Sequence, residues 1–251
     1  MKTVIIFNTI NRPEMVKTTM VNNILNAGTS DIEICVTNNG GPDATIRAIR
    51  FLKEKVPPRK VHAFFNPENV GNSASLNQML KFIDENIPDV GYIAKLDDDI
   101  ELKPGWLSEA KKKFNQMRKL SMLPGLCGFN WGNLKKDREP FNTKIQCYTP
   151  ARVFGSWVFP FEIFKKLGYF VELSKYGLWD SEFNNRLLTS GFVNFYLEGY
   201  DSNHIGADAG THSDYRHMKN EELKKASRLY EKIITIRPSR IDWDKRKFWE
   251  K

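Results

Sequence analysis

The sequence lacks the features that define several common classes of protein. Its 251 residues include only three cysteines, which are widely spaced and form no CxxC pair. This usage argues against a disulfide framework and against a zinc site. It is typical of a reducing compartment, so we expect a cytoplasmic protein. The N-terminal run MKTVIIFNT has too few apolar residues for a signal peptide, and no later run has the length that crosses a bilayer.

Glycine-rich phosphate-binding motifs are missing as well. The sequence contains neither GxGxxG nor GxxxxGK(S/T), which argues against a nicotinamide-binding site and against a P-loop. It also contains no internal repeat, no low-complexity linker and none of the named nucleic-acid-binding motifs. A single globular domain is the simplest organisation that these absences leave.

Basic residues outnumber acidic ones by 38 to 30, which gives a formal net charge of +8. A positive protein favours an anionic partner, such as a nucleotide, an acidic polymer, a nucleic acid or a membrane surface. The excess lies in short clusters such as 111–113 and 245–247, each of which is typical of a solvated surface.

In the first hundred residues, short apolar runs alternate with amphipathic segments. They predict strands at 4–7, 32–36, 61–65 and 91–96, and helices at 13–27, 43–55 and 73–86. This alternation is typical of an α/β fold with a mostly parallel central sheet flanked by helices. A polar loop follows each strand, so we expect these loops to meet in one cleft at the carboxyl ends of the strands.

The pattern is less regular beyond Trp106. We expect, in order, a basic helix to about Leu120, a strand and turn at 125–132, a buried strand at 153–159, a helix at 161–167, a helix entered through 176–183, strands at 192–197 and 200–205, a loop at 206–216, an amphipathic helix at 219–236 and a basic tail.

Three consecutive carboxylates, Asp97, Asp98 and Asp99, end the strand at 91–96. Like charges this close raise one another's pKa values, so the cluster is tolerated where a cation binds or where it projects into water. In an extended strand Asp97 and Asp99 lie on the same side, which suits Mg2+ or Mn2+ with positions left open for phosphate oxygens. An EF-hand is excluded because leucine and serine stand where that loop needs glycine and glutamate. A solvated strand end is the alternative.

Six short motifs follow one another along the chain: Asn11-Arg12-Pro13, Asn66-x-x-Asn69-x-Gly71 with Asn77 downstream, Leu96-Asp97-Asp98-Asp99-Ile100, Pro104-Gly105-Trp106, Gly155-Ser156, and Gly177-x-x-Asp180-x-Glu182-Phe183-x-x-Arg186. Together they resemble family 2 glycosyltransferases of the GT-A fold, over roughly residues 3–215. The resemblance implies one GT-A domain at 1–218, with a nucleotide-sugar-binding half at 1–105 and an acceptor and catalytic half at 106–218. The amphipathic helix and basic tail at 219–251 would follow it.

The resemblance also implies an activity. Such an enzyme moves a sugar, with inversion, from a nucleotide-diphospho-sugar to an acceptor hydroxyl. Asp97 and Asp99 would hold Mn2+ or Mg2+ against the donor diphosphate. The rest of the donor would be bound through Thr9, Asn11, Arg12, Asn38, Asn39, Asn69, Gly71, Asn77, Asp97 and Asp98. The family usually has an acidic residue after the second strand, where this chain has asparagines, so the identity of the nucleotide base stays open.

By the same resemblance Asp180 would be the catalytic base, because a carboxylate must take the proton of an acceptor hydroxyl whose pKa lies far above 7. Glu182 is the alternative base, and a helix N-cap is the alternative role for Asp180. Similar enzymes often use a histidine after the last strands as a third metal ligand. We prefer His204, which closes an apolar strand, over His212.

The sequence does not identify the acceptor. Trp131, Trp157 and Trp179 are candidates to stack on it, with core packing as the alternative, and Arg216 or Lys219 are candidates to clamp the diphosphate. The positive charge favours an anionic acceptor: a glycan, a nucleic acid or a lipid-linked molecule. Two other functions compete. A nucleotidyltransferase is disfavoured by the glycine-free loop at 8–13, and a non-catalytic nucleic-acid-binding protein would bind polymer with strong salt dependence and turn over no donor.

Overall fold

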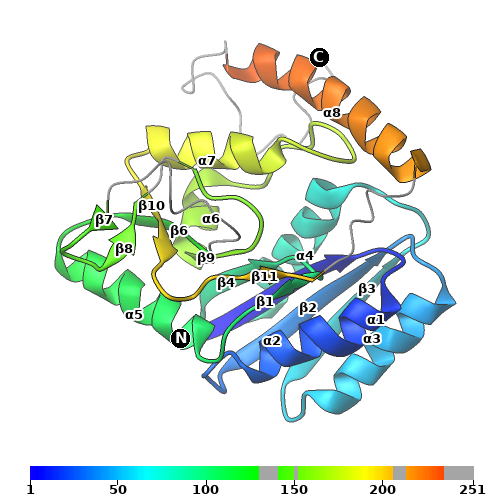
Figure 1. Ribbon diagram of the computed structural model, residues 1–251, viewed down its shortest axis with the longest axis horizontal. Helices are drawn as coiled ribbons and strands as arrows, with labels where there is room; N and C mark the ends of the chain where they lie inside the picture. The colour runs from blue at the N-terminus through cyan, green and yellow to red at the C-terminus, as the bar shows by residue number, and fades with distance from the viewer. Residues whose placement is uncertain (130–140, 150–151, 206–212, 235–251) are drawn as a thin grey trace.

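One sheet forms the centre of the molecule (Figure 1). The structure is a computed structural model that describes residues 1–129, 141–149, 152–205 and 213–234. Within these residues the sheet has nine strands in the order β3-β2-β1-β4-β9-β6-β10-β8-β7. The strands are β1 (Lys2–Thr9), β2 (Ile32–Asn39), β3 (Lys60–Asn66), β4 (Val90–Leu96), β6 (Pro124–Gly128), β7 (Phe141–Asn142), β8 (Cys147–Tyr148), β9 (Trp157–Pro160) and β10 (Val193–Leu197).

The first four strands form the parallel part of the sheet that the alternating pattern predicts. β3, β2, β1 and β4 are parallel neighbours. Successive residues of β1 point to opposite faces: Ile5 and Phe7 join one apolar cluster, and Val4 and Ile6 join the other. Both faces are therefore buried at β1, which explains why this predicted strand is apolar along its whole length.

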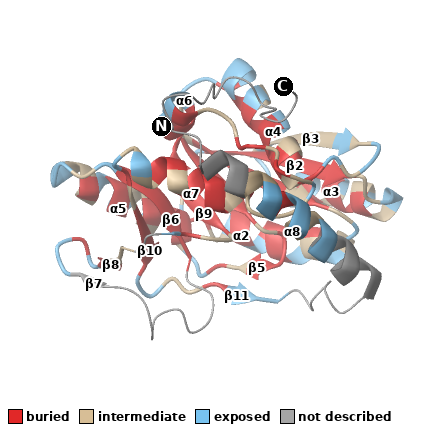
Figure 2. Cartoon of the chain, turned by 90° about the horizontal axis from the view of Figure 1, so that it is seen from above, coloured by how far each residue is buried: buried red, intermediate tan, exposed pale blue. Residues whose placement is uncertain are grey.

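Helices cover both faces (Figures 1 and 2). The face of Ile5 carries the continuous helical segment α1 (Pro13–Met15), η1 (Val16–Met20) and α2 (Val21–Leu25), together with α3 (Asp43–Lys55) and α5 (Trp106–Lys119). The face of Ile6 carries α4 (Asn72–Asn86), α6 (Phe161–Leu167) and α7 (Trp179–Thr189). Pro13 is the first residue of α1, where its missing N–H costs no hydrogen bond. These positions agree with the predicted helices.

The second half of the sheet is mixed. β9 lies between β4 and β6 and is antiparallel to both, whereas β10 is parallel to β6 and antiparallel to β8. Two predicted strands are shorter than expected. The strand predicted at 153–159 begins only at Trp157, after a bend at Gly155, whose φ is +73°. The strand predicted at 200–205 is reduced to β11 (Asn203–His204), which pairs with β5 (Ile100–Glu101) outside the main sheet.

The C-terminal helix α8 (Ser213–Ile234) begins six residues before the predicted start at 219. The loop predicted at 206–216 is therefore wrong for residues 213–216, and its remaining residues, like the basic tail from 235, lie outside the described part of the chain. α8 packs through a small apolar cluster of its own, in which Ala226 meets Val171 and Leu173. Among the described residues, no helix has both the length and the apolar character needed to cross a membrane.

The three cysteines, Cys35, Cys127 and Cys147, are buried and unpaired, as their spacing predicts. Burial raises the pKa of the Cys147 thiol to about 12. They act as small apolar side chains of the core.

Candidate active site

The polar loops at the carboxyl ends of the first strands meet, as the sequence predicts. Asn8, near the end of β1, donates from Nδ2 to Oδ1 of Asn72 at the start of α4, over 2.7 Å. Asn39, at the end of β2, donates from Nδ2 to Oδ1 of Asn69 at 3.0 Å and to the carbonyl of Gly71 at 3.2 Å. Segments that are far apart in sequence thus form one polar edge of the sheet.

The two asparagines that end β2 are hydrogen-bonded to loop residues. Both side chains are buried. Asn38 donates from Nδ2 to the carbonyl of Gly41 at 2.9 Å and accepts at Oδ1 from the N–H of Gly41 at 3.0 Å. Gly40 has a φ of +79°, and a Cβ there would collide with the backbone of Glu68. In this structure Asn38 and Asn39 shape the loop, and their contact with a nucleoside stays a prediction.

The acidic residues do not continue the strand. β4 ends at Leu96, and the chain turns at Asp98 and Asp99. The expectation that strand alternation places Asp97 and Asp99 on the same side is therefore wrong, because the extended backbone that it needs ends before them. The carboxylates divide instead: that of Asp97 contacts a lysine, and those of Asp98 and Asp99 contact an arginine.

Asp98 and Asp99 share one cation. Nη1 of Arg12 donates to Oδ1 of Asp98 at 2.7 Å and to Oδ2 of Asp99 at 2.6 Å. Oγ1 of Thr9 donates to the other oxygen of Asp98 at 2.7 Å. Burial raises the pKa of Asp98 to about 6, although Arg12 and Thr9 oppose this rise. Burial lowers the pKa of Arg12, but the two carboxylates outweigh it and hold that pKa above its ordinary value. Thr9 and Arg12, both predicted donor residues, therefore lie at the acidic turn; Asn11, between them, is exposed and has a φ of +52°.

His204 reaches the same turn from the other half of the chain. β11 pairs with β5 in antiparallel register and places His204 opposite Ile100. The N–H of Ile205 donates to the carbonyl of Asp99 at 2.9 Å. As a result, Nε2 of His204 lies 3.4 Å from Oδ2 of Asp99. The histidine that the sequence favours is thus beside one of the predicted metal-binding carboxylates.

Two of the three predicted metal ligands are therefore close together, and the third is not with them. The described residues contain no group of three or more His, Cys, Asp or Glu side chains placed to hold a metal ion, and His212 lies outside them. A carboxylate oxygen and an imidazole nitrogen nevertheless suit Mn2+. An ion that binds with a nucleotide takes few protein ligands and completes its shell with phosphate oxygens and water. The pair Asp99 and His204 fits such an ion.

Asp97 faces a cavity of about 390 Å3. The walls of the cavity also include Asn72 of α4, Gly155 before β9, Asp180 of α7 and Leu223 of α8. The predicted base Asp180 and the first residue of the acidic triplet therefore meet at one hollow beside the polar edge of the sheet.

Lys95 supplies positive charge to this cavity. Its side chain is only 4% exposed, and Nζ contacts the carboxylate of Asp97. Nζ also donates to the carbonyl of Gly155 at 3.1 Å and lies 5.4 Å from the centre of the Trp179 ring. Sequence reasoning misses Lys95 because it sits within an apolar run. The available signal was a lysine in a strand predicted to be buried, which needs a charged partner.

Asp180 lies in the first turn of α7, but it is not the N-cap. That position is Leu178, which has a φ of +57°. Oδ1 of Asp180 accepts from the N–H of Ser181 at 2.8 Å. Burial raises the pKa of Asp180, Asp97 adds to the rise, and Lys95 opposes it. A carboxylate with a raised pKa at a cavity wall is what a general base requires.

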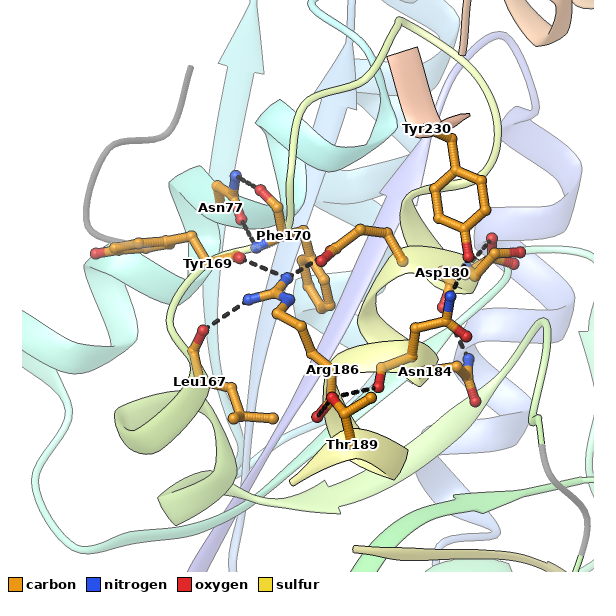
Figure 3. A network of polar contacts seen from close by, with 12 residues as sticks. Asn77, Leu167, Tyr169, Phe170, Asp180, Asn184, Arg186, Thr189 and Tyr230 are labelled. Carbon is orange, nitrogen blue, oxygen red and sulfur yellow. Dashed lines mark hydrogen bonds and ion pairs between the residues drawn. The ribbon is translucent and has the colours of Figure 1, made fainter. Parts of the chain in front are cut away.

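Glu182, the alternative base, faces the interior and does not line this cavity. It is 2% exposed, and Oε2 accepts from Nη2 of Arg186 at 2.7 Å. Figure 3 shows the guanidinium of Arg186 also bonded to the carbonyls of Leu167 and Tyr169, at 2.6 and 2.9 Å. Burial raises the pKa of Glu182, and Arg186 opposes this rise. Arg186 thus holds α7 to the end of α6 and to the residues that follow it.

Asn77, predicted to bind the donor, also has a structural position. Its Nδ2 donates to the carbonyl of Phe170 at 2.9 Å, and its Oδ1 accepts from the N–H of Phe170 at 3.0 Å (Figure 3). The side chain is buried and is not part of the cavity wall. Asn77 anchors the segment after α6 to α4.

The aromatic residues that were candidates for acceptor stacking are mostly core residues. Trp157 is fully buried, so its proposed contact with an acceptor is wrong. Trp179 lines the cavity, but its ring packs against Trp157 and beneath Lys95. Trp131 and the side chains of Arg216 and Lys219 lie outside the described part of the structure.

A family model described as glycosyl transferase family 2 matches residues 4–176, more than half of the chain. The chain belongs to glycosyl transferase family 2. This finding confirms the predicted family, the similar structures confirm the GT-A fold, and both support a glycosyltransferase enzyme. It favours that enzyme over a nucleotidyltransferase and over a non-catalytic nucleic-acid-binding protein. No curated protein matches the sequence.

Several solved structures share the fold of this family 2 member. The mannosyltransferase PcManGT from Pyrobaculum calidifontis, in complex with GDP-Man and Mn2+, is 14% identical with a TM-score of 0.67, covering 94% of this chain and 65% of its own. S. aureus TarS 1–349 in complex with UDP-GlcNAc is 14% identical with a TM-score of 0.60, and the match covers 82% of this chain and 61% of TarS 1–349. GalNAc-T7 with UDP, GalNAc and Mn2+ is 12% identical with a TM-score of 0.64, and the match covers 81% of this chain and 44% of GalNAc-T7. The chain thus spans about two thirds or less of each of these proteins.

Proposed function

We propose that this family 2 member is an inverting, metal-dependent glycosyltransferase that uses a nucleotide-diphospho-sugar. The observation that carries the proposal is the meeting of Asp97, Lys95 and Asp180 at one cavity, beside a turn where Asp99 and His204 lie 3.4 Å apart. The residues at the cavity have the charges needed to transfer a sugar. Asp99 and His204 have the ligand atoms needed to hold a divalent ion.

The donor would lie across the polar edge of the sheet. Its diphosphate would approach the acidic turn with Mn2+ or Mg2+, held by Asp99 and His204. The bound ion would supply positive charge that stabilises the departing nucleoside diphosphate. The similar structures contain GDP-Man with Mn2+, UDP-GlcNAc, and UDP with GalNAc and Mn2+, which supports this class of donor and leaves the nucleotide and sugar to experiment.

Asp180 would take the proton of the acceptor. As the acceptor oxygen forms its bond to the anomeric carbon, its proton passes to the Asp180 carboxylate. The bond from that carbon to the diphosphate oxygen breaks, and its electron pair leaves with the diphosphate. One displacement from the face opposite the leaving group inverts the anomeric centre. Lys95 would favour the ionised form of Asp180 against the repulsion from Asp97.

The acceptor and the compartment are further parts of the proposal. The net charge of +8 supports an anionic acceptor. The three buried, unpaired cysteines support a cytoplasmic protein. We also retain a single catalytic domain at 1–218. α8 contributes Leu223 to the cavity wall, so in this proposal the segment after 218 borders the site although it lies outside the proposed domain.

Donor hydrolysis across a panel of UDP-, GDP-, ADP-, CDP- and dTDP-sugars tests the proposal. We expect turnover of one donor that stops with EDTA and returns with Mn2+ or Mg2+. Proton NMR within the first minutes should show a released sugar of the anomeric configuration opposite to that of the donor. Absence of binding of every nucleotide-sugar in the presence of metal would contradict the proposal, and retention of configuration would contradict its mechanism.

A further inference from the structure

The acidic turn is occupied by a cation that belongs to the chain itself. Oδ2 of Asp99 accepts from Nη1 of Arg12 at 2.6 Å, and the same oxygen lies 3.4 Å from Nε2 of His204. The guanidinium of Arg12 and the imidazole of His204, a proposed metal ligand, therefore approach the same carboxylate oxygen. A divalent ion bound by His204 and this oxygen of Asp99 would compete with Arg12 for the oxygen.

The charges at the turn make this competition strong. Asp98 and Asp99 are nearly buried, and the Arg12 side chain is 26% exposed. With the guanidinium in place, the two carboxylates keep one net negative charge. A divalent ion that entered alone would convert this to one net positive charge, with two cations close together in a region of low dielectric. A nucleoside diphosphate that entered with the ion would supply the missing negative charge.

The backbone fixes Arg12 beside the acidic turn, whereas its side chain is 26% exposed. Asn11 has a φ of +52°, a conformation that asparagine tolerates better than most residues. Pro13 follows as the first residue of α1, and the carbonyl of Arg12 accepts from the N–H of Val16 at 3.3 Å. A rotation of the long, partly exposed side chain can therefore carry the guanidinium from Asp99 to a phosphate without a change of the backbone.

We propose that Arg12 occupies the metal-binding oxygen of Asp99 in the free enzyme, so that the divalent ion binds together with the nucleoside diphosphate and not before it. When the diphosphate arrives, the guanidinium exchanges the carboxylate for a phosphate oxygen, to which it can donate equally well. Arg12 is then a positioning residue that orders the binding of ion and donor. This inference rests on the proposed function, because it takes Asp99 and His204 as metal ligands.

Binding of Mn2+ to the full chain, followed by the EPR signal of the free ion, tests the inference without any turnover. The titration is made with Mn2+ alone, with UDP and with GDP. We expect the wild type to bind Mn2+ alone weakly and to bind it about tenfold or more tightly with one of the two nucleotides, a usual size for a coupling between sites. Arg12→Ala and Arg12→Gln should bind Mn2+ alone about tenfold more tightly than the wild type, so that the gain from nucleotide shrinks.

A gain of affinity cannot come from a damaged fold, which makes the sign of the effect informative. Arg12→Lys keeps the positive charge and should leave the affinity for Mn2+ alone weak. Arg47→Ala removes an exposed arginine from α3 and should change nothing. Adding Asp99→Asn to Arg12→Ala should abolish the gain.

Two failures are distinguishable. If nucleotide strengthens Mn2+ binding in the wild type but neither Arg12→Ala nor Arg12→Gln binds Mn2+ alone more tightly, the role of Arg12 is wrong and the metal-dependent function stands. If no protein takes up Mn2+ with either nucleotide, the metal site and the inference both fail.

Discussion

Lys95 and Asp97 form an ion pair at the wall of the cavity that also holds Asp180. The ammonium is almost fully buried, whereas 32% of the Asp97 side chain is exposed. Lys95 lies in β4 and Asp97 directly follows the strand. The pair places a positive charge near two carboxylates, Asp97 and Asp180, that would otherwise repel each other.

The pH dependence of donor turnover should report this arrangement. Asp180 must be ionised to act as a base, and burial raises its pKa, so kcat should rise with pH through a midpoint above the ordinary value of 3.8. Lys95→Met removes the group that opposes the rise, so its midpoint should lie at higher pH than that of the wild type. Lys53→Met, at an exposed position of α3, should leave the profile unchanged. Coincident profiles for Lys95→Met and the wild type would contradict the role given to Lys95.

The pair Glu182 and Arg186 should matter for stability. Arg186→Met leaves a buried carboxylate without a partner, which costs about 3–5 kcal/mol in the free energy of unfolding. The double variant Glu182→Gln/Arg186→Met removes the uncompensated charge and should recover part of this loss. Urea unfolding monitored by circular dichroism measures both. A double variant as unstable as Arg186→Met would show that the pair is not the source of the effect.

The contact between α8 and the cavity can be tested at Gly177. This residue has a φ of +101°, and a Cβ there would collide with Leu223. Gly177→Ala should therefore loosen α8 and speed amide hydrogen exchange at 220–230, because the apolar cluster through which α8 packs is small. Gly191→Ala is the matched control: its φ is +80°, and its Cβ would meet nothing within 4 Å. Equal exchange rates in α8 for the two variants would contradict this prediction, because they would show that the collision with Leu223 does not loosen the helix.

Loss of either proposed metal ligand should weaken metal binding in the presence of nucleotide. Even residues that only orient a ligand typically contribute 10–100-fold to metal affinity, so Asp99→Asn and His204→Ala should each lose about tenfold or more. Isothermal titration with Mn2+ and the nucleotide of the preferred donor gives the affinities. His62→Ala removes a histidine that bonds Glu33 of β2 and serves as the control. Wild-type affinity in His204→Ala would return the choice of third ligand to His212.

The first half of the fold could be predicted from the sequence because its signals are local. Alternating apolar runs and helical periodicity locate β1 to β4 and the helices between them, and the parallel order follows from the crossover rule. The position of β9 between β4 and β6 could not be predicted in the same way. Val158 of β9 pairs with Ala94 of β4 and with Cys127 of β6, and pairing between strands so far apart in sequence leaves no trace in either segment alone.

The site shows the same division between local and long-range information. Asp180 lies at the cavity and His204 lies beside Asp99, and the roles expected of them from the resemblance stay predictions. The burial of Glu182 and Asn77 depends on contacts with segments far along the chain, and a sequence motif does not reveal such contacts. The sequence likewise does not reveal that Asp97 contacts a lysine while Asp98 and Asp99 contact an arginine. This arrangement follows from the turn at Asp98 and Asp99, which the change from apolar to acidic residues does not predict.

Donor binding and donor hydrolysis, measured side by side for the wild type, Asp180→Asn and Glu182→Gln, test the central claim most directly. Asp180→Asn should bind the preferred nucleotide-sugar within a few-fold of the wild type and lose about 10²–10⁴-fold in turnover, because only the proton transfer is removed. Glu182→Gln, if folded by circular dichroism, should retain most of the turnover. Full turnover in Asp180→Asn, or a loss in Glu182→Gln as large as the one expected for Asp180→Asn, would contradict the assignment of Asp180 as the base.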